Sequence, residues 1–352
     1  MEIFWVWLSQ LKYVGPVLQK KLIKQFHSPL AVYEASEDAL LEVPQMSKKA
    51  VHSILSSHSL KDAEVILEKV NKSNIKLLFF HDEHYPIFAK KAKESPVVLY
   101  FRGELKRIEA SVGVVGARRC TLYGRKMAEQ IGGELAELEI PVVSGFARGI
   151  DSYAQAACIR KGGYTVSFLG CGPDVCYPPE QRMLYNKILE NGGGFISPFP
   201  SGTPPISKFF LTRNALISAW STELVIVEAA VQSGALSTAN FARKNNRLVY
   251  AVPNQIGVPE GVGTNELLSH GVPPYLGIHS LQAIKNKVKR KLEFASSHHE
   301  KNPILLLIND SAQTIQQLSK QLNLTETELI DKLLDLELMK QIIIKGNIVR
   351  KI

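Results

Sequence analysis

Glycines and arginines that follow predicted strands are the residues of this sequence best suited to chemistry. In residues 141–151, two valines indicate a buried strand, Gly145 allows a tight turn, and Gly149 opens a helix. Such a turn directs backbone N–H groups and the positive end of a helix dipole toward one point, an arrangement that binds phosphate. Arg148 adds a mobile positive charge beside that point. The segment therefore predicts an anion-binding turn.

The same pattern recurs along the chain. The other predicted strands lie within residues 111–119, 165–170, 224–229 and 247–253, and the first of these ends in Gly116 and two arginines. Apolar runs of this length, separated by helical segments, predict a parallel sheet with helices on both faces. The glycines then fall at the carboxyl edge of the sheet, where open α/β sheets bind ligands.

Residues 208–214 combine two aromatic side chains with cations. Aromatic rings can stack on the bases of a single-stranded nucleic acid while lysine and arginine hold its phosphates. Phe209 and Phe210 supply the rings, and the polar groups come from Lys208, Arg213 and Asn214. The alternative is that one or both phenylalanines belong to the hydrophobic core.

Composition indicates a globular protein with an anionic partner. The chain has 352 residues, 45% of them hydrophobic, which predicts two or three domains. Its formal net charge is +9, and a basic excess suits nucleic acid. No apolar run reaches the roughly 18 residues of a membrane span, and the start of the chain lacks the features of a signal peptide. We therefore expect a cytoplasmic protein that does not contact a membrane.

The four cysteines are scattered, at positions 120, 158, 171 and 176. Their spacing does not fit a zinc site, so we expect reduced thiols, no metal and no cofactor.

Four segments are expected along the chain. Residues 1–70 are expected to form a helical domain similar to a SAM or helix-hairpin-helix domain, whose turn Val14-Gly15-Pro16 could offer backbone N–H groups to a DNA phosphate. The alternative is a small helical domain that only packs on the main one. Residues 71–284 form the α/β domain, and residues 285–302 form a basic and polar linker. Residues 303–352 predict three helices and a hairpin, the order of a winged helix.

The third helix of the final module is acidic. It carries Glu326, Glu328 and Asp331, with Lys332 as the opposing charge in this stretch. An acidic recognition helix fits duplex DNA poorly, so the sequence favours a protein contact for this module over a DNA contact.

Enzyme classes with known loop motifs fit less well. A dinucleotide-binding fold needs further glycines after its first strand and an acid after its second, but arginine and serine stand at these places. A Walker loop is absent, and Ser144 lacks the preceding glycine of a nucleophile elbow. Asp151 is expected to orient Arg148 or backbone groups. Glu228 could act as a general base, but no partner acid accompanies it in the sequence.

The order of these segments resembles the DprA family of bacterial DNA-processing proteins, also called Smf. The matching motifs are Ser144–Gly–Phe–Ala–Arg–Gly–Ile–Asp151, Leu169–Gly–Cys–Gly172 with Tyr177 and Pro178, Arg213 with Asn214, Val227–Glu–Ala229, Ser233–Gly–Ala–Leu236 with Thr238, and Ala251–Val–Pro253. The resemblance implies an extended Rossmann fold that binds single-stranded DNA, forms homodimers and helps to load the recombinase RecA during natural transformation. It implies no catalytic activity.

The resemblance also implies site residues. The phosphate-binding positions are Gly116, Arg118, Ser144, Gly145, Arg148 and Gly149 in the first two turns, Lys208, Arg213 and Asn214 in the aromatic segment, and Ser233, Gly234 and Thr238 at a later helix start. Phe210 is the candidate for base stacking. The alternative function is a Rossmann-type nucleotide hydrolase, similar to the nucleoside-monophosphate phosphoribohydrolases, with Glu228 in its active site.

Overall fold

The computed structural model describes residues 1–283, 303–308, 312–338 and 342–351. The chain divides into two compact units, Met1–Ile284 and Lys285–Ile352, which are described separately below. The basic and polar linker expected at 285–302 lies outside the described residues. The expected boundary near residue 70 falls inside the first unit, where it stays a prediction.

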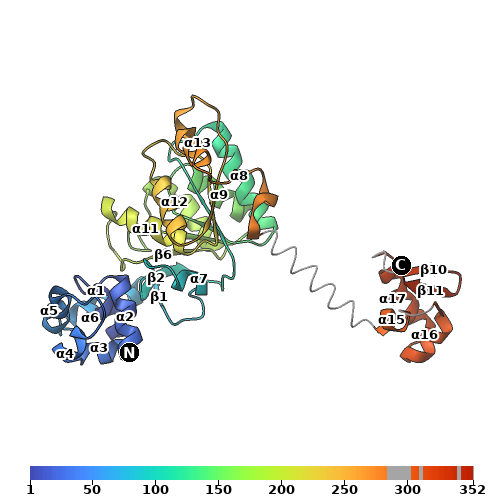
Figure 1. The fold of residues 1–352 in the computed structure, drawn as a ribbon, viewed down its shortest axis with the longest axis horizontal. Coiled ribbons are helices and arrows are strands. Elements are labelled where there is room, and N and C mark those ends of the chain that lie inside the picture. The colour runs from blue at the N-terminus through green and yellow to red at the C-terminus, as the bar shows by residue number, and fades with distance from the viewer. Residues whose placement is uncertain (284–302, 309–311, 339–341, 352) are drawn as a thin grey trace. The chain divides into compact units, whose positions relative to one another are not determined.

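Six helices form the N-terminal lobe of the first unit (Figure 1). They are α1 (Glu2–Gln10), α2 (Pro16–Phe26), α3 (Pro29–Tyr33), α4 (Glu37–Leu41), α5 (Lys48–Ser56) and α6 (Lys61–Lys72). Serine side chains cap three of these helices, because Ser28, Ser36 and Ser47 each accept a hydrogen bond from the backbone N–H three residues later. The lobe has its own core, which includes Trp7, Leu22 and Ile54.

An eight-stranded sheet forms the centre of the first unit. Its strand order is β1-β2-β6-β5-β4-β3-β7-β8. The strands are β1 (Lys76–Phe79), β2 (Val98–Gly103), β3 (Val112–Val115), β4 (Val142–Ser144), β5 (Thr165–Phe168), β6 (Gly194–Ser197), β7 (Glu223–Ile226) and β8 (Leu248–Ala251). Strands β3 to β8 run parallel, and the strand order reverses at the β3–β7 pair.

The predicted strands β3, β4, β5, β7 and β8 run parallel as expected, but one edge of the sheet does not. Strand β2 pairs antiparallel with both β1 and β6, so the edge of the sheet nearest the N-terminal lobe is antiparallel. Strand β6 itself was not predicted, because it is four residues long and follows Gly192 and Gly193, which weaken any strand pattern. The fold is therefore mixed α/β with a mostly parallel sheet.

Helices cover both faces of the sheet. The core on one face joins β3 and β4 valines to α8 (Leu122–Glu137) and α9 (Ile150–Arg160). The core on the other face includes residues of α7 (Ile87–Lys90), α11 (Ser207–Ala219) and α12 (Gly234–Lys244). Helices α10 (Arg182–Glu190) and α13 (Val262–Ser269) and three short 3₁₀ helices (Pro179–Gln181, Pro259–Gly261 and Ile278–Ser280) complete this unit as described.

The second unit contains short helices and a three-stranded sheet. The elements are α15 (Pro303–Leu307), β9 (Gln313–Thr314), α16 (Ile315–Leu322), α17 (Glu326–Leu338), β10 (Ile342–Lys345) and β11 (Ile348–Lys351), with strand order β10-β11-β9. Thr314 and Gln317 form a reciprocal capping box at the start of α16. Among the helices described in the two units, none has the length and apolar character that crossing a bilayer requires.

Candidate nucleic-acid interface

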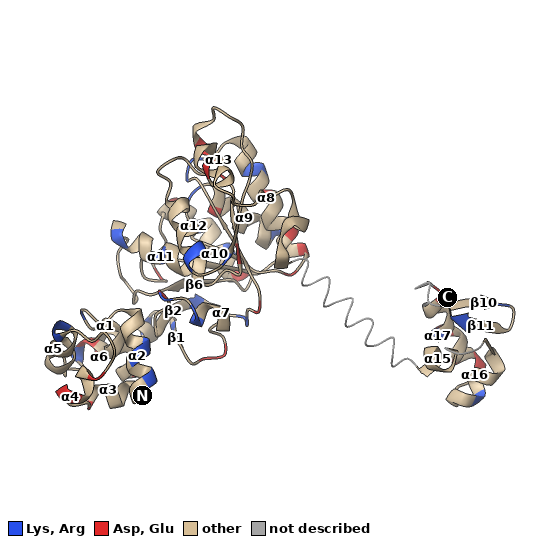
Figure 2. Cartoon of the chain, viewed as in Figure 1, with Lys and Arg blue, Asp and Glu red and all other residues tan. Residues whose placement is uncertain are grey.

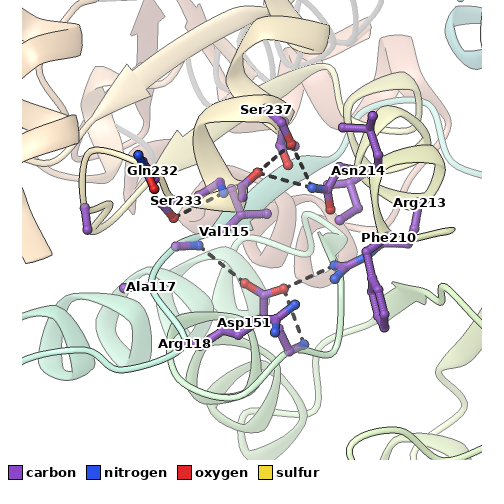
Figure 3. A pocket seen from close by; sticks show the side chains of 18 of the residues that line it. Val115, Ala117, Arg118, Asp151, Phe210, Arg213, Asn214, Gln232, Ser233 and Ser237 are labelled. Carbon is purple, nitrogen blue, oxygen red and sulfur yellow. Dashed lines mark hydrogen bonds and ion pairs between the residues drawn. The ribbon is translucent and has the colours of Figure 1, made fainter. Parts of the chain in front are cut away.

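A cavity opens where the strand order of the sheet reverses. It has a volume of about 770 Å³ and is lined by the loops after β3, β4 and β7 and by α11 and α12 (Figure 3). Parallel α/β sheets bind ligands at this switch point, because the loops on either side diverge and leave a crevice. Gly116, Arg118, Phe210, Arg213, Asn214, Ser233, Gly234 and Thr238 all line it, so the structure brings together most of the predicted site residues.

Asp151 organises the base of this cavity. Its buried carboxylate accepts hydrogen bonds from the backbone N–H groups of Gly116, Gly145 and Ala147, at 3.4, 3.1 and 3.4 Å. The carboxylate therefore ties the loop after β3 to the loop after β4. Burial raises the pKa of Asp151, and the nearby Arg213 and the three N–H groups oppose that rise. Asp151 orients backbone groups, as expected, but its cationic partner is Arg213 rather than Arg148.

Arg213 lines the cavity, but its side chain is almost completely buried. Its side chain is 6% exposed, and its Nη1 atom lies 3.6 Å from Oδ2 of Asp151 (Figure 3). Burial lowers the pKa of Arg213, and Asp151 opposes this shift. The ion pair with Asp151 shows that Arg213 fixes the shape of the site. A direct contact between Arg213 and a phosphate stays a prediction.

Gly145 and Ser144 also pack and hydrogen-bond within the protein. A Cβ atom on Gly145 would lie on top of Arg213, so the guanidinium packs directly against this glycine. The N–H of Gly145 is used by Asp151, and the Ser144 hydroxyl donates to the carbonyl of Val114 at 2.6 Å from a fully buried position. We therefore remove the Ser144 hydroxyl and the Gly145 N–H from the candidate phosphate contacts.

Phe210 lines both the cavity described above and a second cavity beside it. The second cavity, of about 320 Å³, shares Arg118, Phe210 and Arg213 with the first, and Arg148 and Tyr177 also line it. The Arg118 guanidinium carbon lies 5.7 Å from the centre of the Phe210 ring, and the Tyr177 ring lies 5.7 Å away at a tilt. A half-buried ring between cations is suited to stack on a base next to phosphate contacts.

The start of α12 closes the other side of the larger cavity. Ser233 caps this helix by accepting from the N–H of Ala235, and Asn214 donates to the Gly234 carbonyl and to the Ser237 hydroxyl. Asn214 thus joins α11 to α12. Thr238 is almost fully buried.

Two further predicted residues, Lys208 and Gly149, line neither cavity. Lys208 is exposed, and its Nζ atom lies 5.5 Å from the centre of the Phe209 ring. Gly149 has a φ of +77°, and a Cβ there would meet the Ala117 carbonyl, so glycine is needed for the close approach of the loops.

Arg148 is exposed and forms an ion pair with Glu180. Local sequence patterns do not indicate this pair, because the two residues are far apart in the chain. It means that a phosphate can reach Arg148 only in competition with a carboxylate of the same chain.

Glu228 does not have the surroundings of a general base. It is fully buried, and its two oxygens accept hydrogen bonds from the N–H of Thr121 at 2.9 Å and from the Thr121 hydroxyl. Glu228 therefore holds Thr121, the N-cap residue of α8, in place. Within the described residues, no group of histidine, cysteine and acidic side chains is arranged to hold a metal ion.

Comparison with known proteins agrees with this architecture. The model of a family described as DNA recombination-mediator protein A matches residues 76–284, which include every strand of the large sheet and both cavities. The chain belongs to this family. Protein Smf of Synechocystis is 33% identical over 287 residues, which cover 80% of this chain and 72% of that protein. Protein Smf of Escherichia coli is 34% identical over 212 residues, but these span only 57% of its length.

Two solved structures are also similar. The X-ray structure of DNA processing protein A from Streptococcus pneumoniae has a TM-score of 0.65 and 25% identity, and the match covers 80% of this chain and 96% of that one. DNA processing protein A from Helicobacter pylori, whose single-stranded DNA binding mode has been described structurally, has a TM-score of 0.54 and 30% identity. That match covers 61% of this chain and 96% of the other.

Proposed function

We propose that this protein binds single-stranded DNA in the two adjoining cavities and helps to load RecA onto it during DNA uptake. The observation that carries the proposal is the position of Phe210, which stands between the two cavities with Arg118 beside its ring. In this arrangement the ring stacks on a base, and Arg118 and Arg148 contact the neighbouring phosphates. Lys208 precedes Phe210 by two residues in α11 and adds an exposed positive charge.

Family membership and the Helicobacter pylori relative support the DNA-binding part of this proposal. The association with RecA, a homodimer, an extended Rossmann fold and a winged-helix assignment for the second unit belong to the same proposal. We infer no catalytic activity. The alternative, a nucleotide hydrolase, is weaker because Glu228, its candidate base, is buried and engaged by Thr121.

The first test is the salt dependence of binding. Affinity for labelled poly-dT should fall with rising salt, with a log–log slope of about −0.7 for each phosphate that the protein neutralises. Arg118→Ala should reduce the magnitude of that slope by about 0.7, because it removes one phosphate contact. Arg243→Ala removes an exposed charge that lines neither cavity and is the control. Equal binding to duplex and single strand would contradict the proposal, because stacking requires unpaired bases.

Glu180→Gln should strengthen binding of poly-dT by about two- to fivefold, because the exposed Arg148–Glu180 pair no longer competes with phosphate. Fluorescence anisotropy at fixed salt measures the effect. Glu190→Gln removes the same charge from an exposed site on α10 and should change affinity less. An identical gain in both variants would show that only the net charge matters and that Arg148 has no direct contact with DNA.

A further inference from the structure

A separate cavity of about 390 Å³ lies in the N-terminal lobe. The turn between α1 and α2 lines it with Lys12 and Tyr13, and α5 lines it with Lys49 and His52. Serines 53, 56, 57 and 59 supply further polar groups. In Figure 1 these helices belong to a different part of the unit from α11 and α12, so this cavity is distinct from the pair described above.

Basic side chains outnumber acidic ones among the residues that line this cavity. Within residues 1–283, the ammonium groups of Lys12 and Lys49 form no ion pair or hydrogen bond, and both side chains are exposed. Helix α5 carries Lys48 and Lys49 in its first turn and no acidic residue there, although the helix dipole favours acids at this end. Among the residues that line the cavity, Asp62 is the one carboxylate. Lysines placed against the dipole cost stability and add positive charge at this end of α5. Figure 2 shows basic positions on α5.

Tyr13 adds a second, independent feature. Its side chain is 68% exposed, and its φ of +63° lies in the left-handed region, which is uncommon for a residue with a large side chain. Neither burial nor backbone geometry accounts for a tyrosine at this position. An exposed ring next to two free lysines is the combination that binds bases and phosphates of a single strand.

We propose that this cavity is a second contact site for single-stranded DNA, in which Lys12 and Lys49 hold phosphates and Tyr13 stacks on a base. The inference rests on the proposed DNA-binding function of the first unit. An exposed aromatic ring beside the lysines favours nucleic acid over a phosphorylated peptide or free phosphate, since neither of these needs a stacking surface. A strand long enough to reach both sites then binds more tightly than a strand that fills only one.

The test uses the full chain and labelled poly-dT of about 40 nucleotides. Lys12→Ala with Lys49→Ala should reduce the magnitude of the salt slope by about 1.4, which corresponds to two phosphates. Tyr13→Asn, which tolerates a positive φ, should weaken binding at least about fivefold. Lys24→Ala with Lys69→Ala is the matched control, because it removes the same charge from exposed positions of the lobe that do not line the cavity. Thermal melts confirm that each variant is folded.

The outcomes separate this proposal from the function it rests on. Binding by the Lys12/Lys49 variant that equals the Lys24/Lys69 control would overturn the second site. Unchanged binding in an Arg118→Ala/Phe210→Ala variant would instead overturn the role of the two adjoining cavities. If inorganic phosphate at millimolar concentration binds the wild type but poly-dT does not, the cavity is an anion site unrelated to DNA and both proposals fail.

Discussion

Replacing Arg213 with methionine should lower the free energy of unfolding by about 3–5 kcal/mol at neutral pH. The change leaves Asp151 ionised inside the protein, with no cation to balance it. Urea denaturation at pH 7 measures the loss. Arg243→Met, at an exposed position of α12, should change stability by less than about 0.5 kcal/mol and serves as the control.

The loss in Arg213→Met should depend on pH with a known sign. Burial already raises the pKa of Asp151, and without Arg213 that pKa rises further. The folded state then binds a proton more readily than the unfolded state, so the stability of the variant falls as pH rises above about 4. The difference from the wild type should be small near that pH and grow toward neutrality. A loss that does not change with pH would show that packing, and not the charge on Asp151, is responsible.

Phe210→Ala should weaken binding to poly-dT by about 5- to 150-fold, which corresponds to about 1–3 kcal/mol for one stacked base. The loss should persist at high salt, because stacking is not screened, and this distinguishes it from the loss in Arg118→Ala. Anisotropy titrations at two salt concentrations give both quantities.

Phe210→Tyr is the matched control for this prediction. It keeps the aromatic face next to Arg118 and should bind within about threefold of the wild type. If Phe210→Ala binds as tightly as Phe210→Tyr, the ring is a wall of the cavities and does not stack on a base.

Much of the fold follows from local sequence patterns. Five strands of the parallel sheet, the helical character of the N-terminal lobe and the glycines at the carboxyl edge were predicted from local patterns of apolar residues and glycine. The six separate helices of the lobe were not. Strand β6 was missed because four residues after two glycines carry no such signature. The antiparallel pairing of β2 with β6 depends on residues far apart in the chain, and periodicity contains no information on that pairing.

The candidate site could also be predicted only in part from the sequence. The motifs indicated which loops meet, and the cavity at the switch point agrees with that expectation. They did not indicate which polar groups are free, because Arg213 and Ser144 look the same in sequence whether they face a ligand or the interior. The deciding partners, Asp151 and the Val114 carbonyl, come from other strands and loops. The exposure of a side chain and its hydrogen-bond and ion-pair partners therefore distinguish residues that can touch a ligand from residues that shape its site.

The contact between Gly145 and Arg213 has a consequence for how this protein can vary among species. No side chain fits at position 145 while a guanidinium occupies the space above it. A lineage that acquires alanine or serine at 145 must therefore move the guanidinium away or shorten residue 213, and either change weakens the counter-charge of Asp151. The three positions should be inherited as a set, so natural variants should retain all three residues or exchange them together.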